Sequence, residues 1–375
     1  MPAFSSDERQ LLHESLTDYF QTKYPFERFR ELSDPEHPDG HGREEWLNYA
    51  ELGWLGVAMG DDAGGSAGGM TELAIVMAAA GGALAMEPLM QTVVLSAAAI
   101  EAAGSADQRA VLSRVASGET VLAFCHSEPD AGYARRHVET LAQPTPEGFR
   151  LRGTKSFTLH AHVADHLVVS ARLGNDSGPI GLFLISAESD GIHRRIAPAL
   201  DGRRGAIVSL SDVRVPRDAL LGDEEADRSD LIDQLLDRGA IATCAEAAGA
   251  MSAVTEQTVE YLKTRQQFGQ PLSKFQVLQH RLVDMSVKTE EARAATHSAL
   301  TALDQRDPNA QTKIWQAKVQ TGQSAHYVGS QAIQLHGGMG MTDELSVGHY
   351  YKRLSLCESA FGDAAWYLRQ LAARS

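Results

Sequence analysis

The sequence has 375 residues, of which 43% are hydrophobic and 22% are charged. This profile is typical of a folded protein and excludes a predominantly disordered chain. At about 150 residues per domain, the length predicts two or three domains. The 49 acidic residues outnumber the 34 basic ones, for a formal net charge of −15. That balance excludes a general nucleic-acid-binding role, because such proteins need basic surface to displace counterions.

Cysteine usage and hydropathy indicate the compartment. Cys125, Cys244 and Cys357 lie far apart and form neither a disulfide framework nor a CxxC metal motif, so we expect a reducing cytoplasm. The first residues lack the basic start and apolar core of a signal peptide. The longest apolar run, 73–86, is shorter than the ~20 residues of a membrane span. We therefore expect no membrane span.

Residues 1–118 are predicted to be helical. Ser5–Glu8 is typical of a helix start, and apolar residues recur at helical spacing from Leu11 to Phe20. Further helices are predicted at 70–86, which is rich in alanine, and at 93–103, with a glycine-rich loop at 60–69.

The hydrophobic pattern changes near Thr120. A hairpin is predicted where 140–141 and 149–151 flank the turn-rich segment 144–148. Other short strands are predicted at 121–125, 167–170, 181–185, 206–210 and 213–216.

The helical period returns near Ser229. It predicts four long helices, with Gly337-Gly338 as a natural stop of the third. Segregated helical and β segments favour an α+β fold over an alternating βαβ sheet. The predicted parts are an N-terminal helical domain over 1–118, a middle β domain over 119–225 and a C-terminal four-helix bundle over 226–375. The four helices are predicted at 229–264, 274–303, 309–335 and 344–373.

Several local patterns point to other chemistry and are weak. Gly64–Gly69 follows no strand, as a dinucleotide-binding loop would, and Gly153–Ser156 lacks the spacing of a P-loop. His160, His162 and His166 share one strand face, but no carboxylate or cysteine completes a ligand set. We expect no metal site. A serine hydrolase is also disfavoured, since Ser127 has no GxSxG context.

Three segments are more informative in combination. They are Phe124–Gly132, Tyr261–Gly269 followed by Phe275-Gln276, and Gln334–Gly340. In this order, on a helix–β–helix layout, they resemble the acyl-CoA dehydrogenase family over nearly the whole chain. Within the family the sequence is most similar to small subunits of the pimeloyl-CoA dehydrogenase type and to subunits of heterotetrameric steroid-side-chain dehydrogenases. The resemblance extends to Asp212–Pro216 and Leu221-Gly222, which end the family's middle, β-barrel-like domain.

The resemblance implies FAD as cofactor and an acyl-CoA thioester as substrate. In the family a carboxylate removes the α-proton, and the β-hydrogen leaves as a hydride to the flavin. One subunit holds the flavin ring and substrate, while its neighbour clamps the adenine and pyrophosphate. The electron acceptor stays open, an electron-carrying flavoprotein being one candidate.

The positions that clamp the adenine half match the family. Arg265 corresponds to the arginine at the pyrophosphate, where a guanidinium fork suits phosphate oxygens. Phe268 corresponds to the aromatic residue beside the cofactor. The polar and glycine positions around the adenosine are matched by Gln276, Gln334, Gly337 and Gly338. The alternative is an ordinary helix end with a surface arginine.

The flavin side departs from the family. Ser127 matches a hydroxyl residue at the flavin ring, but Phe157 replaces the usual tryptophan. Leu159 replaces a threonine, for which Thr158 could substitute only with a change of register, and Tyr133 replaces a small serine.

The catalytic base is missing from both of its family positions. The usual glutamate falls on Phe361, and the alternative location falls on Gly239. Asp363 and Glu358 are the nearby carboxylates that a shifted helix could use, although a solvated or capping role is the simpler interpretation. A base must reach its proton within about 3 Å, so closeness in sequence is not sufficient.

Arg194-Arg195 and Arg203-Arg204 bring local positive charge to an acidic chain. They fit either the phosphates of a CoA ester or a solvated strand end. The resulting hypothesis is an acyl-CoA dehydrogenase subunit that is a partner in a heterotetramer and completes another chain's FAD site. Two alternatives stay open: a homo-oligomer with a relocated carboxylate base, and an inactive scaffold protein that kept the fold.

Overall fold

The computed structural model describes residues 4–374, and the contacts within it divide the chain into two compact units. The first, helical unit takes the residues up to Glu31, Met70–Ala85 and the chain from Ala240 onward. The second unit takes Leu32–Gly69 and Met86–Gly239. The predicted boundaries near 118 and 225 follow changes of hydrophobic period, whereas these units follow packing, and the two divisions differ. The three-part boundaries therefore stay a prediction.

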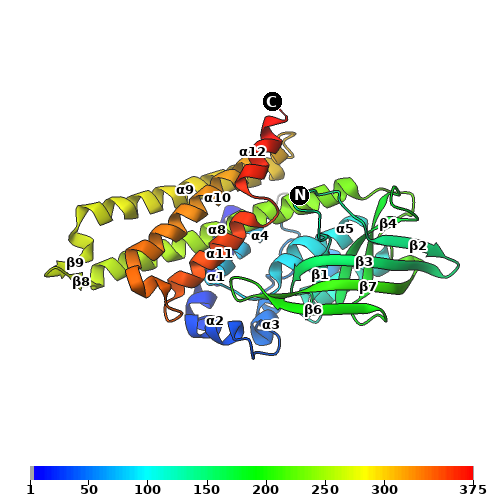
Figure 1. Ribbon diagram of the computed structural model, residues 1–375, viewed down its shortest axis with the longest axis horizontal. Coiled ribbons are helices and arrows are strands. Elements are labelled where there is room, and N and C mark those ends of the chain that lie inside the picture. Colours follow the sequence, from blue (N-terminus) through cyan, green and yellow to red (C-terminus); the bar gives the residue numbers. More distant parts are fainter. Residues whose placement is uncertain (1–3, 375) are drawn as a thin grey trace. The chain divides into compact units, whose positions relative to one another are not determined.

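The helical unit is built mainly from α4, α8, α9 and α10. Figure 1 shows α8, α9 and α10 running side by side, and α4 packs against α1 and α9. A capping box at Ser5 and Glu8 starts α1, as the sequence predicted. The helices of this unit are α1 (Ser6–Lys23), α2 in its first residues (Phe26–Ser33), α4 (Met70–Gly82), α8 (Ser229–Thr264) from Ala240 on, α9 (Gln276–Asp304), α10 (Ala310–His336), α11 (Ser346–Ser359) and α12 (Ala364–Ala372), with η4 (Leu272–Lys274) and η5 (Gly337–Met341) between them.

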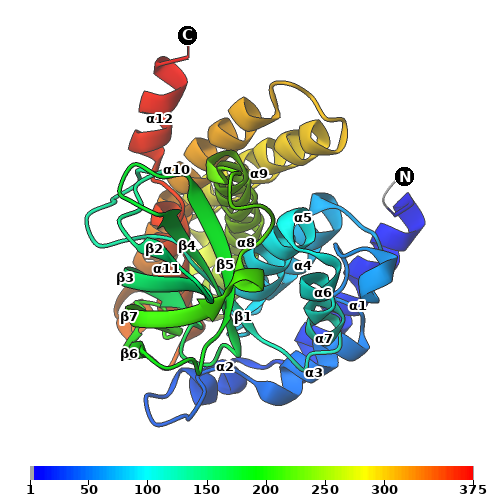
Figure 2. The same ribbon diagram turned by 90° about the vertical axis from the view of Figure 1, so that its right-hand side faces the viewer.

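The second unit holds a seven-stranded mixed sheet, curled in Figure 2. Its strand order is β1-β4-β2-β3-β7-β6, with β5 also pairing with β4. The predicted hairpin is confirmed, because β2 and β3 pair antiparallel across it. The strands are β1 (Leu122–Cys125), β2 (Leu141–Thr145), β3 (Gly148–Leu159), β4 (His166–Leu173), β5 (Ile180–Ser186), β6 (Ile192–Pro198) and β7 (Arg204–Pro216).

Short helices complete the second unit. They are α3 (Arg43–Glu51), η1 (Asp61–Ala63), η2 (Met90–Ala97), α5 (Ala98–Ala103), α6 (Ala106–Arg109), α7 (Val111–Ala116) and η3 (Arg217–Ala219).

The α+β fold and three of the four long C-terminal helices are confirmed. The helix expected at 229–264 is α8, with the same bounds, and α9 and α10 agree within two residues at either end. The fourth prediction was wrong in one respect, because 344–373 forms two helices. The break lies at Phe361 and Gly362, where φ is 60° and 122° and a right-handed helix cannot continue.

Two further segments differ from the sequence-based expectation. The helix expected at 93–103 begins at Met90 and runs as a π-helix before α5. The edge strand β6 was missed because most of its residues are exposed and it carries no apolar alternation. All three cysteines are buried, and none of them forms a disulfide within residues 4–374. Within residues 4–374, no helix is both long and apolar enough to cross a membrane.

Candidate functional site

Six residues predicted to clamp the adenine half of a cofactor lie where helices of the first unit end. They come from the C-terminus of α8, the hairpin after it, the start of α9 and the end of α10 (Figure 1). All six are exposed. We call this group the helix-end cluster: Arg265, Phe268, Gln276, Gln334, Gly337 and Gly338.

Three side-chain contacts hold these helix ends together. The Tyr261 ring stacks on the His336 ring at 4.3 Å between centroids, and its hydroxyl donates to the His336 carbonyl oxygen at 3.3 Å. Arg281 on α9 donates to Gln331 on α10 at 3.4 Å. The segments that carry the cluster are therefore fixed relative to one another.

Phe268 is displayed at the tip of a tight hairpin. Strands β8 (Gln266–Gln267) and β9 (Gln270–Pro271) pair antiparallel, and the turn residues Phe268 and Gly269 have φ of 53° and 78°. Two positive φ values characterise the type I′ turn. The Phe268 ring is 88% exposed and lies edge-on to the Phe275 ring in a T-shaped arrangement, with the centroids 6.0 Å apart. A large apolar side chain held out on a strained turn is suited to a contact outside its own chain.

The two glycines of the cluster leave open space beside the backbone. Gly337 ends α10 with φ of 60°. A Cβ atom built on Gly337 or Gly338 would have no heavy atom within 4 Å. These glycines are therefore not required for packing within the chain, and another molecule can approach the backbone there closely.

Arg265 provides a cation that its own chain does not neutralise. Within residues 4–374 its side chain has no ion pair or hydrogen bond, whereas the neighbouring Lys263 pairs with Glu260 at 2.6 Å. An unpaired guanidinium can bind phosphate oxygens through two parallel hydrogen bonds. Together with the exposed ring and the open glycines, it fits a ligand that combines phosphates with a flat apolar body.

The predicted flavin-side residues lie in the second unit, around β3. Ser127 and Phe157 are both exposed, and the Ser127 carbonyl oxygen accepts a hydrogen bond from Ser156 N at 2.8 Å. Phe157 lies in an irregularity of the β3–β7 pairing between Lys155 and Thr158, and its side chain is 37% exposed. The Thr158 hydroxyl donates to the Ser156 carbonyl oxygen at 3.2 Å, and the residue is mostly buried. Whether Thr158 substitutes for the family threonine stays a prediction.

A buried ion pair supports this part of the sheet. Lys155 Nζ contacts Glu128 Oε1 at 2.5 Å and also donates to Ser170 Oγ at 3.0 Å and to the His126 carbonyl oxygen at 3.3 Å. Burial raises the pKa of Glu128, but the adjacent Lys155 ammonium and the hydrogen bonds from Thr140 and Glu139 N together outweigh it and leave this pKa below its usual value. The charged pair fixes the backbone on both sides of Ser127. Sequence reasoning missed this pair, because its partners are separated by a hairpin.

The loop that carries the usual base position, Ser359–Asp363, and the end of α11 just before it are held by three side chains. We call Ser359–Asp363 the base loop. Tyr367 Oη donates to the Phe361 carbonyl oxygen at 2.8 Å. The Asp363 carboxylate accepts from Trp366 N at 2.7 Å and caps α12. Lys318 Nζ donates to the carbonyl oxygens of Cys357 and Glu358, at 2.7 and 2.8 Å.

The two candidate bases therefore have different surroundings. Asp363 acts as a helix cap, as the simpler interpretation of the sequence expected. Glu358 is partly exposed on α11, with its Cγ 3.4 Å from where a Cβ on Gly322 would lie. Phe361 stands in a left-handed conformation that is strained for a bulky residue. At the alternative base position, Gly239 offers no side chain, and the neighbouring Arg238 donates to the Val94 carbonyl oxygen at 3.0 Å.

Three family models cover most of the chain. The N-terminal domain of acyl-CoA dehydrogenase matches residues 6–119, the middle domain matches 123–213 and the C-terminal domain matches 230–375. The chain belongs to the acyl-CoA dehydrogenase family.

Individual relatives and solved structures are consistent with this assignment. FadE12 of Mycobacterium tuberculosis H37Rv is 30% identical, over 91% of this chain and 89% of its own length. The ChsE4–ChsE5 complex from Mycobacterium tuberculosis superposes with a TM-score of 0.89 at 25% identity, covering 100% of this chain and 98% of the matched one. PigA, solved with FAD and proline, has a TM-score of 0.90 at 23% identity, over 100% and 99% of the two chains, and so shares the fold.

The arginines considered for CoA phosphates are mostly engaged within the second unit. Arg194 pairs with Glu188, Arg203 pairs with Asp201 at 2.7 Å, and Arg204 donates to backbone carbonyls of residues 34 and 37. The exposed Arg195 on β6 is the remaining member of the four. A phosphate contact by the whole group would require these bonds to be exchanged.

The histidines set aside as metal ligands point to backbone carbonyls. His160 Nε2 lies 2.8 Å from the Met86 carbonyl oxygen, and His162 Nε2 lies 2.9 Å from that of Asp39. Across the described residues, the single group with suitable spacing is Glu128, His137 and Glu139, whose ligand atoms lie within 4.8 Å of one another. Within that group, Glu128 Oε1 already accepts hydrogen bonds from Lys155 Nζ and Thr140 Oγ1.

Proposed function

We propose that this chain is a subunit of an FAD-dependent acyl-CoA dehydrogenase. The assembly catalyses α,β-dehydrogenation of an acyl-CoA thioester, and this chain clamps the adenine and pyrophosphate of an FAD whose flavin ring lies in a partner subunit. The partner is a second acyl-CoA dehydrogenase chain, in a heterotetramer that holds two FAD per four chains.

The observation that carries the proposal is the exposed and unpaired state of the helix-end cluster. Each member that matches the family is directed to solvent, and Arg265 lacks a counter-ion among the described residues. The departures fall on the other side: Tyr133, Phe157, Leu159, Gly239 and Phe361. Random loss of function would not be expected to spare one half of a cofactor site and to alter the other.

The chain's own residues define its part in the reaction. Arg265 neutralises pyrophosphate charge, and the Phe268 ring covers the cofactor from water. Gln276 and Gln334 supply hydrogen bonds, while Gly337 and Gly338 let the backbone approach the adenosine. FAD supplies hydride acceptance when it is bound. Phe361 cannot move a proton, so the partner provides the base.

Asp363 gives a further reason for the asymmetry. At its family position it would stand close to the cofactor, where an uncompensated carboxylate repels pyrophosphate. An arrangement in which this chain holds no flavin of its own removes that repulsion. The ChsE4–ChsE5 complex, one chain of which shares this fold, offers a precedent for a heteromeric assembly.

Flavin stoichiometry tests the proposal. The chain is purified alone and with a co-expressed acyl-CoA dehydrogenase partner, and flavin absorbance is compared with protein concentration. We expect little FAD on the chain alone and one FAD per two chains in the complex. One FAD per chain with turnover in a homo-oligomer would support the relocated carboxylate instead. Absence of FAD in both samples would support the inactive scaffold.

A further inference from the structure

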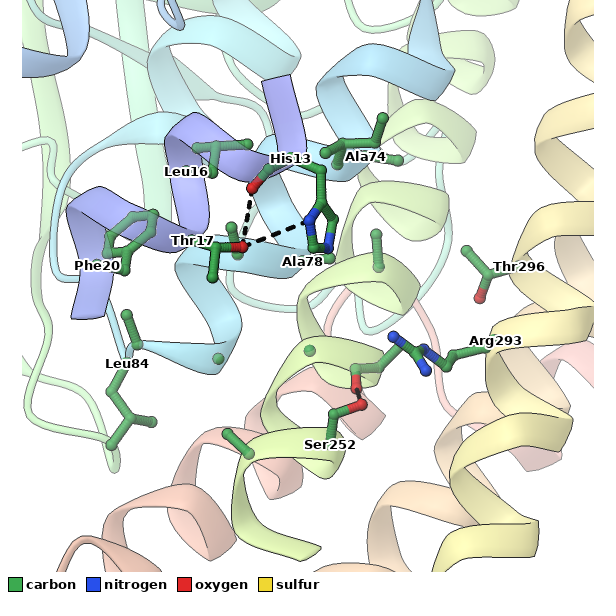
Figure 3. A pocket seen from close by; sticks show the side chains of 18 of the residues that line it. His13, Leu16, Thr17, Phe20, Ala74, Ala78, Leu84, Ser252, Arg293 and Thr296 are labelled. Carbon is green, nitrogen blue, oxygen red and sulfur yellow. Dashed lines mark hydrogen bonds between the residues drawn. The ribbon is translucent and has the colours of Figure 1, made fainter. Parts of the chain in front are cut away.

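The helical unit contains a cavity of about 710 Å³ that is separate from the helix-end cluster and the base loop. Its walls come from α1, α4, α8 and α9, with the start of α11 at one side. Figure 3 shows His13 and Thr17 of α1 facing Arg293 and Thr296 of α9 across the opening, with Ala78 of α4 between them. The volume falls within the range of small-molecule sites, about 300–1,000 Å³.

The cavity arises from how α4 crosses α8. A Cβ atom on Gly81 would lie 2.0 Å from the Glu246 carbonyl oxygen, and one on Gly249 would lie 1.8 Å from that of Ala78. The two backbones are therefore in close contact, which only glycine permits. Beside this crossing the walls carry small side chains that cannot fill the space towards α1 and α9. These are Ala74, Ala78, Ala79, Ala83, Ala245, Ala248 and Ala253.

The cavity has an apolar floor, and its lining includes basic side chains whose acidic partners, Glu72 for Arg9 and Glu290 for Arg293, are not themselves lining residues. Leu16, Phe20, Leu84 and Leu300 are buried side chains that line the floor together with the alanines. The described lining includes two arginines and two histidines but no aspartate or glutamate. In a chain of net charge −15, such a sign reversal indicates complementarity to an anion.

The two arginines are held to different degrees. Arg9 forms a 2.7 Å ion pair with Glu72, whose side chain is 0% exposed, so Arg9 is part of the wall. Arg293 pairs at 2.9 Å with Glu290, one turn away on α9, and both side chains are more than half exposed. Exposed pairs of this kind contribute little, so the Arg293 guanidinium is free to change partners. In Figure 3 it points from α9 towards the middle of the opening.

We propose that this cavity binds a monocarboxylate with an elongated apolar body, a free fatty acid being the simplest example. The chain lies against the alanine-rich floor, and the carboxylate meets Arg293, with His13 and His297 beside it. None of its lining residues belongs to the helix-end cluster or to the base loop, and the inference does not depend on the proposed subunit role.

Calorimetric titration of the intact protein with dodecanoate, below its micelle concentration, tests the site. Arg293→Gln should weaken binding about five- to tenfold, as expected for loss of a charge-assisted hydrogen bond. Lys288→Gln is the matched control, because Lys288 forms the same i,i+3 pair on α9, with Glu291 at 2.8 Å, but does not line the cavity. It should leave binding unchanged. The alcohol 1-dodecanol should bind more weakly than dodecanoate and be insensitive to Arg293→Gln.

Ala78→Phe fills the cavity and should abolish dodecanoate binding. Arg293 is a surface residue, so the Arg293→Gln variant still tests the site if Ala78→Phe does not fold. Arg265→Ala should retain full dodecanoate affinity even if it loses flavin, which separates this site from the proposed clamp. Equal affinity in wild type and Arg293→Gln, or no binding to wild type, would overturn the inference. A change of oligomeric mass in Ala78→Phe, without dodecanoate binding to wild type, would assign the cavity to a second copy of the chain.

Discussion

The Lys318 ammonium on α10 donates a 2.7 Å hydrogen bond to the carbonyl oxygen of Cys357 on α11. Lys318 is 1% exposed, and burial holds its pKa below the ordinary value. The last carbonyls of a helix have no partner within the helix. A buried lysine here completes the end of α11 and anchors the base loop that follows.

Replacement of Lys318 by methionine should destabilise the protein by about 2 kcal/mol, because two carbonyls lose their donor while the buried charge is removed. The measurement is the free energy of unfolding in urea. Lys313→Met on the same helix is the control, since Lys313 is partly exposed and pairs with Asp307 at 3.1 Å. It should change stability by less than about 1 kcal/mol. Equal losses of unfolding free energy for both substitutions would show that the buried Lys318 contacts stabilise the protein no more than the partly exposed Lys313 does.

Arg265→Ala should release FAD from the assembled enzyme. The expected loss is on the order of tenfold or more in affinity, since hydrogen bonds to charged groups contribute about 1.5–3 kcal/mol. Arg265→Lys should lie between alanine and wild type, because an ammonium cannot form the fork. The measurement is the ratio of flavin to protein absorbance after gel filtration. The control, Lys263→Ala, removes a cation two residues away that is already paired with Glu260. An equal loss of FAD from this control would mean that FAD retention depends on net charge alone.

Asp363 allows the capping and proton-transfer roles to be separated. Asparagine is as good an N-cap as aspartate, so Asp363→Asn should keep stability, whereas Asp363→Ala should cost about 1 kcal/mol. If the partner supplies the base, both variants should retain turnover in the assembled enzyme once folded. The same holds for Glu358→Gln. Abolished turnover in a folded Asp363→Asn or Glu358→Gln protein would instead identify a relocated base.

Three buried histidines of the second unit should make the protein acid-sensitive. Burial lowers the pKa of His41 and of His126 to about 4, and that of His160 well below its usual value. Between pH 6.5 and 4 the unfolded chain binds protons that the folded chain does not, so stability falls as pH falls. Each histidine contributes up to about 1.4 kcal/mol per pH unit.

Glu87 acts in the opposite direction. Burial raises its pKa to about 7, so the folded chain holds a proton there between pH 4.5 and 7 that the unfolded chain has lost.

The contribution of the histidines is measured by urea unfolding at pH 7, 6 and 5 for wild type and His126→Gln. We expect the variant to have the shallower pH dependence. Parallel curves would show that His126 titrates alike in both states.

The long helices could be predicted from sequence because their apolar period is continuous and their ends carry recognisable signals. The bounds of α8 were obtained in full, and Gly337 marked the end of α10. The break between α11 and α12 could not be predicted from sequence. It rests on a left-handed phenylalanine, Phe361, whose carbonyl oxygen is held by Tyr367 only in the folded structure. Likewise β6 was missed, since an exposed edge strand has no buried face to leave a pattern.

The candidate site divides in the same way. Local motifs identified the members of the helix-end cluster, because arginine, phenylalanine and glycine at fixed spacing define a hairpin and a helix end. Their exposure and the free state of Arg265 required the structure. Lys318 was missed although a signal existed: it shares the buried face of α10 with Ile314 and Ala325, four residues before and seven after it, where a lysine needs a partner.

The type I′ hairpin of β8 and β9 holds a large apolar side chain in water, which is energetically unfavourable. Its short turn keeps the Phe268 ring in water, and covering such a ring is favourable by about 2 kcal/mol. Because the turn is already ordered, little conformational entropy is lost when the ring is covered. A newly made copy therefore exposes an apolar ring that the proposed assembly would cover. If the proposed heteromer forms, cells would need to match the supply of this chain to that of its partner, since unassembled copies would share an exposed site for aggregation.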